Sequence, residues 1–284
     1  MRLYFSEVEQ LKTAIEHICS RPEPEQDPDA REVFAQLRDA LTAGLVRAAE
    51  PVGDEWIVNT WVKQGILLGF KLGELVETGD ESGLSFVDKN TLPVRHFHAL
   101  DQVRLVPGGS AVRQGAYVAP SVICMPPMYI NVGAYVDEGT MVDSHALVGS
   151  CAQVGKRVHL SAGAQVGGVL EPINAVPVVV EDDVLVGGNC GVYEGTWVRK
   201  GAVLGAGTIL TRSMQLYDLV NGRIIRANEE MPLTVPENAV VVPGARSVRK
   251  GIAAEWNIAL YTPVIVKYRD EKTLRSTELE ELLR

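Results

Sequence analysis

Aliphatic residues recur at every sixth position through the middle of the chain. The series is Val112, Val118, Cys124, Ile130, Val136, Val142, Val148, Val154, Leu160 and Val166, and it resumes as Val180, Val186, Val192, Val198, Leu204, Leu210 and Leu216. A helix places apolar residues three or four apart and a single strand places them two apart, so a period of six fits neither element. The pattern predicts a parallel β-coil in which each hexapeptide forms one short strand and one turn, with the aliphatic side chain pointing inward.

The phase of this repeat breaks once, between Val166 and Val180. Pro172 and Pro177 lie in the break, and proline cannot donate to a strand ladder. We therefore expect a loop that leaves the coil, which is a common place for binding residues on a rigid scaffold.

The region before the repeat has a different pattern. Residues 28–45 carry apolar side chains at helical spacing, which predicts a surface helix. A second, mixed apolar stretch at 56–75 is expected to pack against this helix. Together they predict an α-rich N-terminal domain.

The region after the repeat reads as short strands. Asn221-Gly222 suits a two-residue hairpin turn that needs positive φ twice. Strands are expected at 239–242 and 264–268, and a closing helical turn at 278–283. The predicted organisation is an α-rich N-terminal domain at 1–105, a parallel β-helix at 106–217 and a β-rich C-terminal cap at 218–284, which makes the chain mainly β.

Composition narrows the function classes. The formal net charge is −9, which disfavours a broad cationic face for nucleic acid. The sequence has no run of 18 apolar residues and its start does not read as a secretory signal, so we expect a cytoplasmic protein that does not bind a membrane. The four cysteines form no CxxC unit and the five histidines do not cluster, so no metal site is expected.

Several motifs within the repeat are more specific than the repeat itself. They are INVGAYVDEGTMVD at 130–143, VGSCAQVGK at 148–156, VHLS at 158–161 and GGVLEP at 167–172. The chain closely resembles the tetrahydrodipicolinate N-succinyltransferases of bacterial lysine and diaminopimelate synthesis, over roughly residues 30–284. The resemblance implies a left-handed β-helix, a homotrimer with sites between subunits, and no permanently bound cofactor.

The resemblance also implies a reaction. It is the transfer of a succinyl group from succinyl-CoA to the amino group of L-2-amino-6-oxopimelate. On the matching positions, Arg104 binds a substrate carboxylate and Asp143 lies against the substrate amine. The residue types suit these roles, because Arg offers a planar fork to a carboxylate and a carboxylate can take the proton that keeps an amine from attacking a thioester.

One position departs from the family pattern. The family has an acidic residue where this chain has Gly191, so a second carboxylate for the amine is missing. Glu194 matches another acidic residue of the same stretch, and we expect it to compensate, or Asp143 to act alone. His145 and His159 are not carried over as bases.

Candidate contacts for CoA are less specific. A pantetheine arm could lie along an edge of the coil where residues are small, which indicates Gly168, Ala206 and Gly207. The basic side chains that could meet phosphates are Lys156, Arg157, Arg199, Lys200, Arg249 and Lys250.

Other functions stay open from the sequence. The chain could use acetyl-CoA, or acylate another lysine-like amino acid in specialised metabolism. A non-catalytic or zinc-binding coil is a further alternative from a different class.

Overall fold

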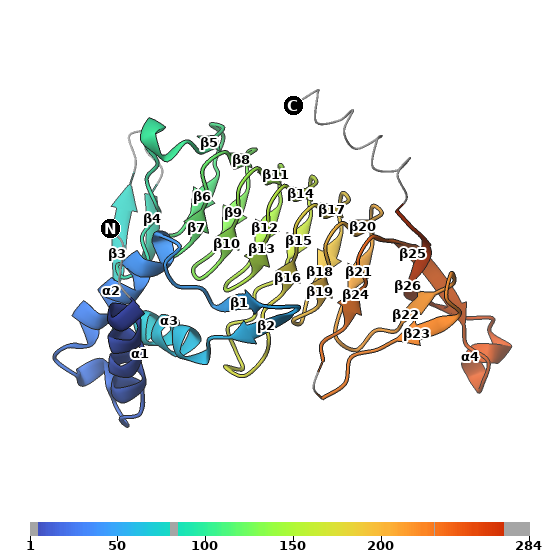
Figure 1. Ribbon diagram of the computed structural model, residues 1–284, viewed down its shortest axis with the longest axis horizontal. Coiled ribbons are helices and arrows are strands. Elements are labelled where there is room, and N and C mark those ends of the chain that lie inside the picture. Colours follow the sequence, from blue (N-terminus) through green and yellow to red (C-terminus); the bar gives the residue numbers. More distant parts are fainter. Residues whose placement is uncertain (1–4, 80–84, 230, 270–284) are drawn as a thin grey trace.

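The computed structural model describes residues 5–79, 85–229 and 231–269. The middle of the chain winds as a three-sided coil: from β5 to β18, each strand pairs in parallel with the third strand after it. The successive turns of the coil stack side by side along the long axis of the molecule (Figure 1). The sequence-based prediction of a mainly β chain built on hexapeptides is thereby confirmed.

Each side of the coil is one parallel sheet, and we number the three sides as faces. Face 1 consists of β5 (Arg104–Leu105), β8 (Ile123–Cys124), β11 (Met141–Val142), β14 (His159–Leu160), β17 (Leu185–Val186) and β20 (Val203–Leu204). Face 2 consists of β6 (Ala111–Val112), β9 (Tyr129–Ile130), β12 (Leu147–Val148), β15 (Gln165–Val166), β18 (Gly191–Val192) and β21 (Ile209–Leu210). Face 3 consists of β7 (Tyr117–Val118), β10 (Tyr135–Val136), β13 (Gln153–Val154), β16 (Val179–Val180), β19 (Trp197–Val198) and β24 (Thr234–Val235).

The core of the coil is the row of residues that the period of six predicted. From β6 to β21 the second residue of every strand is buried, and these side chains form one continuous cluster. Equivalent residues of adjacent turns stand in register, as Val142 does with Cys124 and Leu160. Stacked aliphatic side chains therefore fill the interior along the whole coil.

Two edges of the coil matter for function, and each is named after one of its residues. The Asp143 edge joins face 1 to face 2 and comprises residues 125–128, 143–146, 161–164, 187–190 and 205–208. The Cys151 edge joins face 2 to face 3 and comprises residues 113–116, 131–134, 149–152, 167–178 and 193–196. The expected loop between Val166 and Val180 is the long corner at 167–178 of the Cys151 edge.

The N-terminal domain packs against face 3 and the Cys151 edge. Its helices are α1 (Phe5–Cys19), α2 (Ala30–Thr42) and α3 (Thr60–Leu72), with a 3-10 turn, η1 (Pro24–Gln26). They share one core with Val132 and Cys151 of the coil. The predicted helix at 28–45 corresponds to α2, and the stretch at 56–75 contains α3.

Two hairpins in this domain were not predicted. They are β1 (Ala49–Val52) with β2 (Glu55–Val58), and β3 (Leu75–Gly79) with β4 (Ser85–Lys89). A second 3-10 turn, η2 (Ala99–Asp101), precedes β5. Arg47 of the domain stacks on Tyr135 of face 3, with its guanidinium carbon 3.6 Å from the ring centroid. The β1–β2 hairpin lies beside the coil in Figure 1.

After face 2 ends at β21, the chain forms two hairpins. The first joins β22 (Leu216–Asp218) to β23 (Arg223–Ile225) through a four-residue loop, not the predicted two-residue turn. The reason is the buried carboxylate of Asp218, which accepts the backbone N–H groups of Val220 and Asn221 and so shapes a longer loop. Of the predicted Asn-Gly pair, only Gly222 has positive φ, at 61°.

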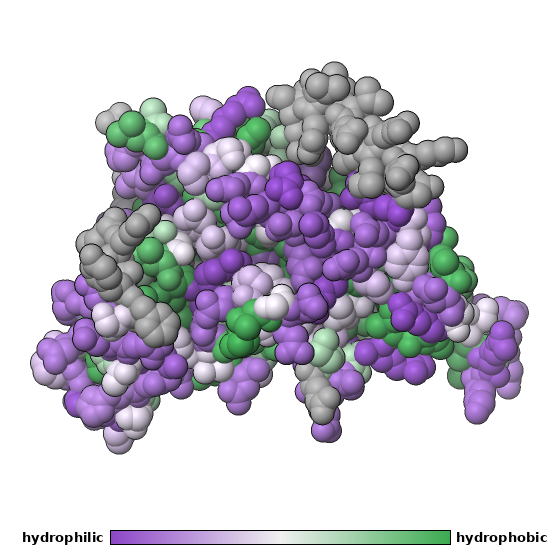
Figure 2. Space-filling model, viewed as in Figure 1, coloured by the Kyte–Doolittle hydropathy of each residue, from purple (hydrophilic) through white to green (hydrophobic). Residues whose placement is uncertain are grey.

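The second hairpin joins β25 (Ala239–Ser247) to β26 (Ala259–Tyr268), both longer than predicted, and carries the short helix α4 (Ile252–Glu255) near its tip. Because β24 and β25 pair with β19 and β20, the faces of the coil extend past residue 217. Trp256 is 68% exposed here, and Figure 2 shows hydrophobic surface at this end of the molecule. The predicted turn at 278–283 lies outside the described residues.

Candidate functional site on the Asp143 edge

Asp143 stands at the corner where β11 turns into β12. Its backbone N–H donates to the Leu160 carbonyl of the next turn at 2.9 Å, which fixes the corner to the coil. One carboxylate oxygen, Oδ1, accepts the Ser144 backbone N–H at 2.7 Å. The other, Oδ2, lies 3.8 Å from Nε2 of His159, and the side chain is 30% exposed. A carboxylate that is held by the backbone and still reaches solvent can receive an ammonium group and its proton.

Arg104 lies on the adjoining face 1. It is the first residue of β5 and is exposed. The register pairs Arg104 with Ile123 and Ile123 with Met141, so two strand spacings separate Arg104 from the strand that leads to Asp143. Two spacings amount to about 10 Å, which a long arginine side chain and a bound dicarboxylate can span together.

Ala206 and Gly207 occupy a later corner of the same Asp143 edge, between β20 and β21. Ala206 is exposed. Gly207 has φ +75°, and a Cβ added to it would lie 3.9 Å from its nearest neighbour, Pro243. The edge between Asp143 and these residues is lined by further small side chains. The sequence-predicted residues Asp143, Ala206 and Gly207 thus lie along one edge, with Arg104 on the face beside it.

Gly168 belongs to the Cys151 edge instead. A Cβ on Gly168 would lie 2.6 Å from the backbone nitrogen of Ser150, and one on Gly149 would lie 2.1 Å from the nitrogen of Gly168. Both glycines are therefore needed for the long corner to pack on the preceding turn. The close packing of the chain itself accounts for a glycine at this position.

Glu194 also lies on the Cys151 edge. Its Oε2 accepts the backbone N–H of Arg212 at 3.0 Å. Within one chain Glu194 is therefore separated from Asp143 by the width of face 2, and the structure does not bring the two carboxylates together.

Tyr193 is a residue of this region that the sequence reasoning missed. Its ring lies over Gly191, where an added Cβ would be 2.3 Å from Cε2 and 2.8 Å from the hydroxyl oxygen. The only signal in the sequence is an aromatic residue two positions after a glycine that occupies an outward strand position. Nothing in that spacing says that the ring folds back over the strand.

Three of the six predicted phosphate-binding cations form ion pairs within the chain. Lys156 pairs with Glu138 at 3.1 Å and Arg157 with Asp183 at 2.6 Å. Arg199 pairs with Glu181 at 2.7 Å. These ion pairs join successive turns along the third edge, between face 3 and face 1. Lys200, Arg249 and Lys250 are exposed.

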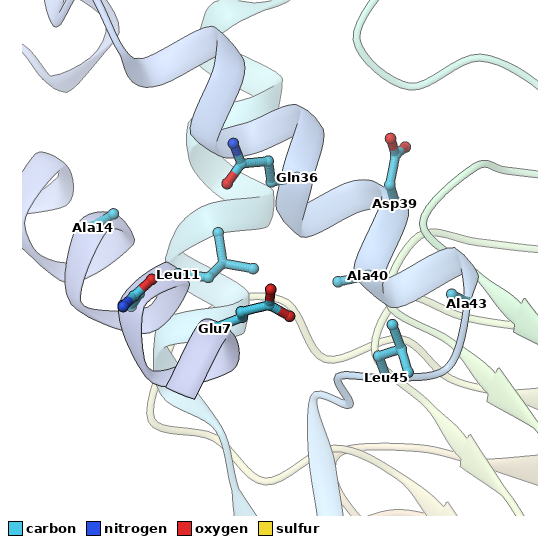
Figure 3. A pocket seen from close by; sticks show the side chains of 9 residues that line it. Glu7, Leu11, Ala14, Gln36, Asp39, Ala40, Ala43 and Leu45 are labelled. Atoms are coloured by element: carbon cyan, nitrogen blue, oxygen red, sulfur yellow. The ribbon is translucent and has the colours of Figure 1, made fainter. Parts of the chain in front are cut away.

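Two clefts lie away from the Asp143 edge. One, of about 690 Å³, separates α1 from α2 and is lined by Leu11, Ala40 and Leu45, with the carboxylates of Glu7 and Asp39 beside them (Figure 3). The other, of about 460 Å³, separates the β1–β2 hairpin from the third edge. The first contains none of the residues that the sequence placed in the acyl-transfer site, whereas the second is lined by Lys156, Arg199 and Lys200, three of the candidate phosphate contacts.

Within residues 5–79, 85–229 and 231–269, no group of three or more His, Cys, Asp or Glu side chains is placed to hold a metal ion. No helix within those ranges has the length and apolar character to cross a membrane.

Comparison with known proteins identifies the family. A family model for the tetrahydrodipicolinate N-succinyltransferase N-terminal region matches residues 10–72, and one for the hexapeptide repeat of succinyl-transferase matches residues 177–212. A 2,3,4,5-tetrahydropyridine-2,6-dicarboxylate N-succinyltransferase of Rhodopseudomonas palustris is 41% identical over 90% of this chain and 90% of its own length. One from Paracoccus denitrificans is 41% identical over 96% of this chain and 98% of its own.

A solved structure shares the fold. The crystal structure of a Campylobacter jejuni protein described as a 2,3,4,5-tetrahydropyridine-2-carboxylate N-succinyltransferase superposes with a TM-score of 0.55 at 18% identity. The match covers 82% of this chain and 62% of that one, so the present chain spans less than two thirds of its length. With near full-length relatives at about 40% identity, the chain belongs to the tetrahydrodipicolinate N-succinyltransferase family.

Proposed function

We propose that the protein transfers a succinyl group from succinyl-CoA to the amino group of L-2-amino-6-oxopimelate, the ring-opened form of tetrahydrodipicolinate. The observation that carries this proposal is the placement of Asp143, with its side chain 30% exposed, on the same edge as the small residues Ala206 and Gly207. The names of the near full-length relatives agree with it.

The reaction needs a proton acceptor beside the amine. Asp143 holds the substrate ammonium group and takes its proton, directly or through water. The amine nitrogen then attacks the thioester carbon, a C–N bond forms, and the C–S bond breaks. Two protons leave the nitrogen in all: one passes to the departing sulfur and the other is released to water, so the products are the succinylated amine and free CoA.

The remaining predicted residues position the two substrates. Arg104 binds a carboxylate of the acceptor through its guanidinium fork. Because Ala206 has a small side chain and Gly207 has none, the pantetheine arm can approach the backbone of the Asp143 edge there. Gly168 and Glu194 lie on the neighbouring Cys151 edge, so in this scheme they support the site from there and do not line the Asp143 edge.

The proposal also covers how copies of the chain assemble. The coil is left-handed, and three copies form a homotrimer in which the sites lie between subunits. Exposed hydrophobic residues near α4, among them Ile252 and Trp256, supply surface that a second copy would bury. The protein works in the cytoplasm, where its four cysteine thiols, which form no disulfide, stay reduced.

A second candidate function uses the same chemistry on other substrates. Gly191 leaves Asp143 without a second carboxylate on face 2, so an acetyl-CoA enzyme, or one that acylates another lysine-like amino acid, is the second candidate. The alternatives separate in a free-CoA release assay that crosses succinyl-CoA and acetyl-CoA with L-2-aminopimelate and lysine-like amines. Release with succinyl-CoA and L-2-aminopimelate alone supports the first proposal, and release only with other pairs supports the second.

A further inference from the structure

The ring of Tyr193 fills a gap in the outer surface of face 2. A Cβ on Gly191 would lie 2.3 Å from Cε2, 2.7 Å from Cζ and 2.8 Å from the hydroxyl oxygen of Tyr193. A Cβ on Gly167, in the preceding turn, would lie 2.8 Å from Cδ1 of the same ring. The ring therefore needs both glycines, and its hydroxyl end lies over Gly191.

This position borders the Asp143 edge. Gly191 directly follows the corner at 187–190, and the register aligns it with Gln165 and Leu147 on face 2. The Gln165 side-chain amide donates to the carbonyl of His145, in the same corner as Asp143, at 3.1 Å. Two strand spacings, about 10 Å, separate Gly191 from the strand that follows Asp143. One bound acceptor can contact both places.

A side chain at residue 191 and the ring of Tyr193 in its present position exclude each other. While the Tyr193 ring lies in place, residue 191 can carry no side chain, because contacts below 3 Å to a ring force one group to move. The chain thus presents an uncharged hydroxyl, which both donates and accepts hydrogen bonds, where a side chain from residue 191 would project. Asp143 is then the carboxylate that meets the acceptor from this chain.

We propose that Tyr193 is a specificity-determining residue of the acceptor site: its hydroxyl replaces a side chain from residue 191 and hydrogen-bonds the amino end of the acceptor that Asp143 holds. The inference rests on the proposed acyl transfer. It assigns the site to acceptors with a single amino group, because the one carboxylate balances the charge of one ammonium group and the neutral hydroxyl adds only a hydrogen bond.

The first test removes only the hydroxyl. Tyr193→Phe keeps the ring over Gly191, and we expect the KM for the amine acceptor to rise about 5-fold, the loss of one hydrogen bond, while the KM for acyl-CoA stays unchanged. Tyr117→Phe, which changes a tyrosine on face 3, is the matched control. Unchanged acceptor kinetics in Tyr193→Phe overturn the proposal.

The second test exchanges the pair. Gly191→Glu alone forces the ring out and lowers the melting temperature, whereas Gly191→Glu combined with Tyr193→Val restores it. The double variant adds a negative charge, so it should bind a diamino acceptor such as lysine better than Tyr193→Val does and shift the acid limb of the kcat profile to higher pH. No gain over Tyr193→Val contradicts the proposal.

The outcomes separate this inference from the proposed function. Absence of CoA release by the wild-type protein with every donor and acceptor pair rejects the acyl transfer and the inference with it. Release by the wild type together with an unaltered Tyr193→Phe variant rejects the role of Tyr193 alone.

Discussion

The Asp143 edge and the Cys151 edge are built from the same hexapeptide, yet they carry different side-chain environments. At the Cys151 edge, Val132 and Cys151 are buried in the core of the N-terminal domain. At the Asp143 edge, the corresponding corners hold Asp143 at 30% exposure and the exposed Ala206. The repeat therefore gives both edges the same kind of backbone. Whether an edge is covered by another part of the protein determines whether its side chains support the fold or can take part in the reaction.

Polar groups follow the same division. The ammonium group of Lys63, in α3, is fully buried and donates to the carbonyl of Ala175 in the long corner of the Cys151 edge. Burial lowers the pKa of Lys63 from its usual value, and the neighbouring Cys151 thiol acts in the opposite direction. A buried, partnered group of this kind serves the fold, whereas Asp143 keeps an oxygen turned to His159 and solvent.

The largest expected effect comes from removing the charge at the Asp143 edge. Asp143→Asn keeps the shape and the hydrogen bond from Ser144 but removes the proton acceptor, so we expect kcat to fall about 1000-fold with an unchanged melting temperature. CoA release and thermal melting measure the two quantities.

Asp137 supplies a closely matched control for this change. It follows β10 as Asp143 follows β11, and its Oδ1 accepts the next backbone N–H, that of Glu138, at 2.8 Å. Asp137→Asn should leave kcat near wild type, because it lies on the third edge. Equal losses in both variants would show that any corner aspartate of this type supports the fold, not the chemistry.

The next effect is expected at the Cys151 edge and should appear in stability. Lys63→Ala leaves a cavity and an unpaired Ala175 carbonyl, so the free energy of unfolding should fall by about 3 kcal/mol, with little change in acceptor KM below the melting transition. Lys71→Ala, at an exposed position of the same helix, is the control.

The same pair of variants gives a pH dependence with a defined sign. A lysine whose pKa is lowered in the folded state lowers the stability of the fold at every pH where the unfolded chain binds the proton more tightly than the folded chain does. This penalty fades as the pH rises toward the ordinary value of 10.5. The stability advantage of wild type over Lys63→Ala should therefore widen with increasing pH, and a constant gap in chemical denaturation would exclude the predicted shift.

The sequence predicted the coil well because each turn repeats the same inward side chain, so the signal accumulates along the chain. It placed Asp143 and Arg104 by motif, and the structure locates them on one edge and its adjoining face. It missed the β1–β2 hairpin, whose strands are short and mostly exposed. It also missed Lys63 and Tyr193, because neither the burial of a helical lysine nor a ring folded over a glycine is encoded in local spacing.

A smaller loss is expected from Arg104. Arg104→Met removes a charged fork from face 1, so the KM for a dicarboxylate acceptor should rise about 20-fold while kcat and the KM for acyl-CoA change little. Arg31→Met, at an exposed site in α2 that pairs only weakly with Glu74 at 3.4 Å, is the control. A selective rise in the acyl-CoA KM would move Arg104 from the acceptor to the donor site.

The smallest effect is expected from Glu194, and it tests the comparison of the edges most sharply. Glu194→Gln can still accept the N–H of Arg212, so the corner should fold normally. Since Glu194 lies on the Cys151 edge, across face 2 from Asp143, we expect kcat to change by less than about 2-fold, a difference below the loss of one ordinary hydrogen bond. Steady-state CoA release measures it. A loss comparable to that of Asp143→Asn would mean that a second copy of the chain brings its Glu194 to the Asp143 edge, so that the two edges form one site only in the assembled protein.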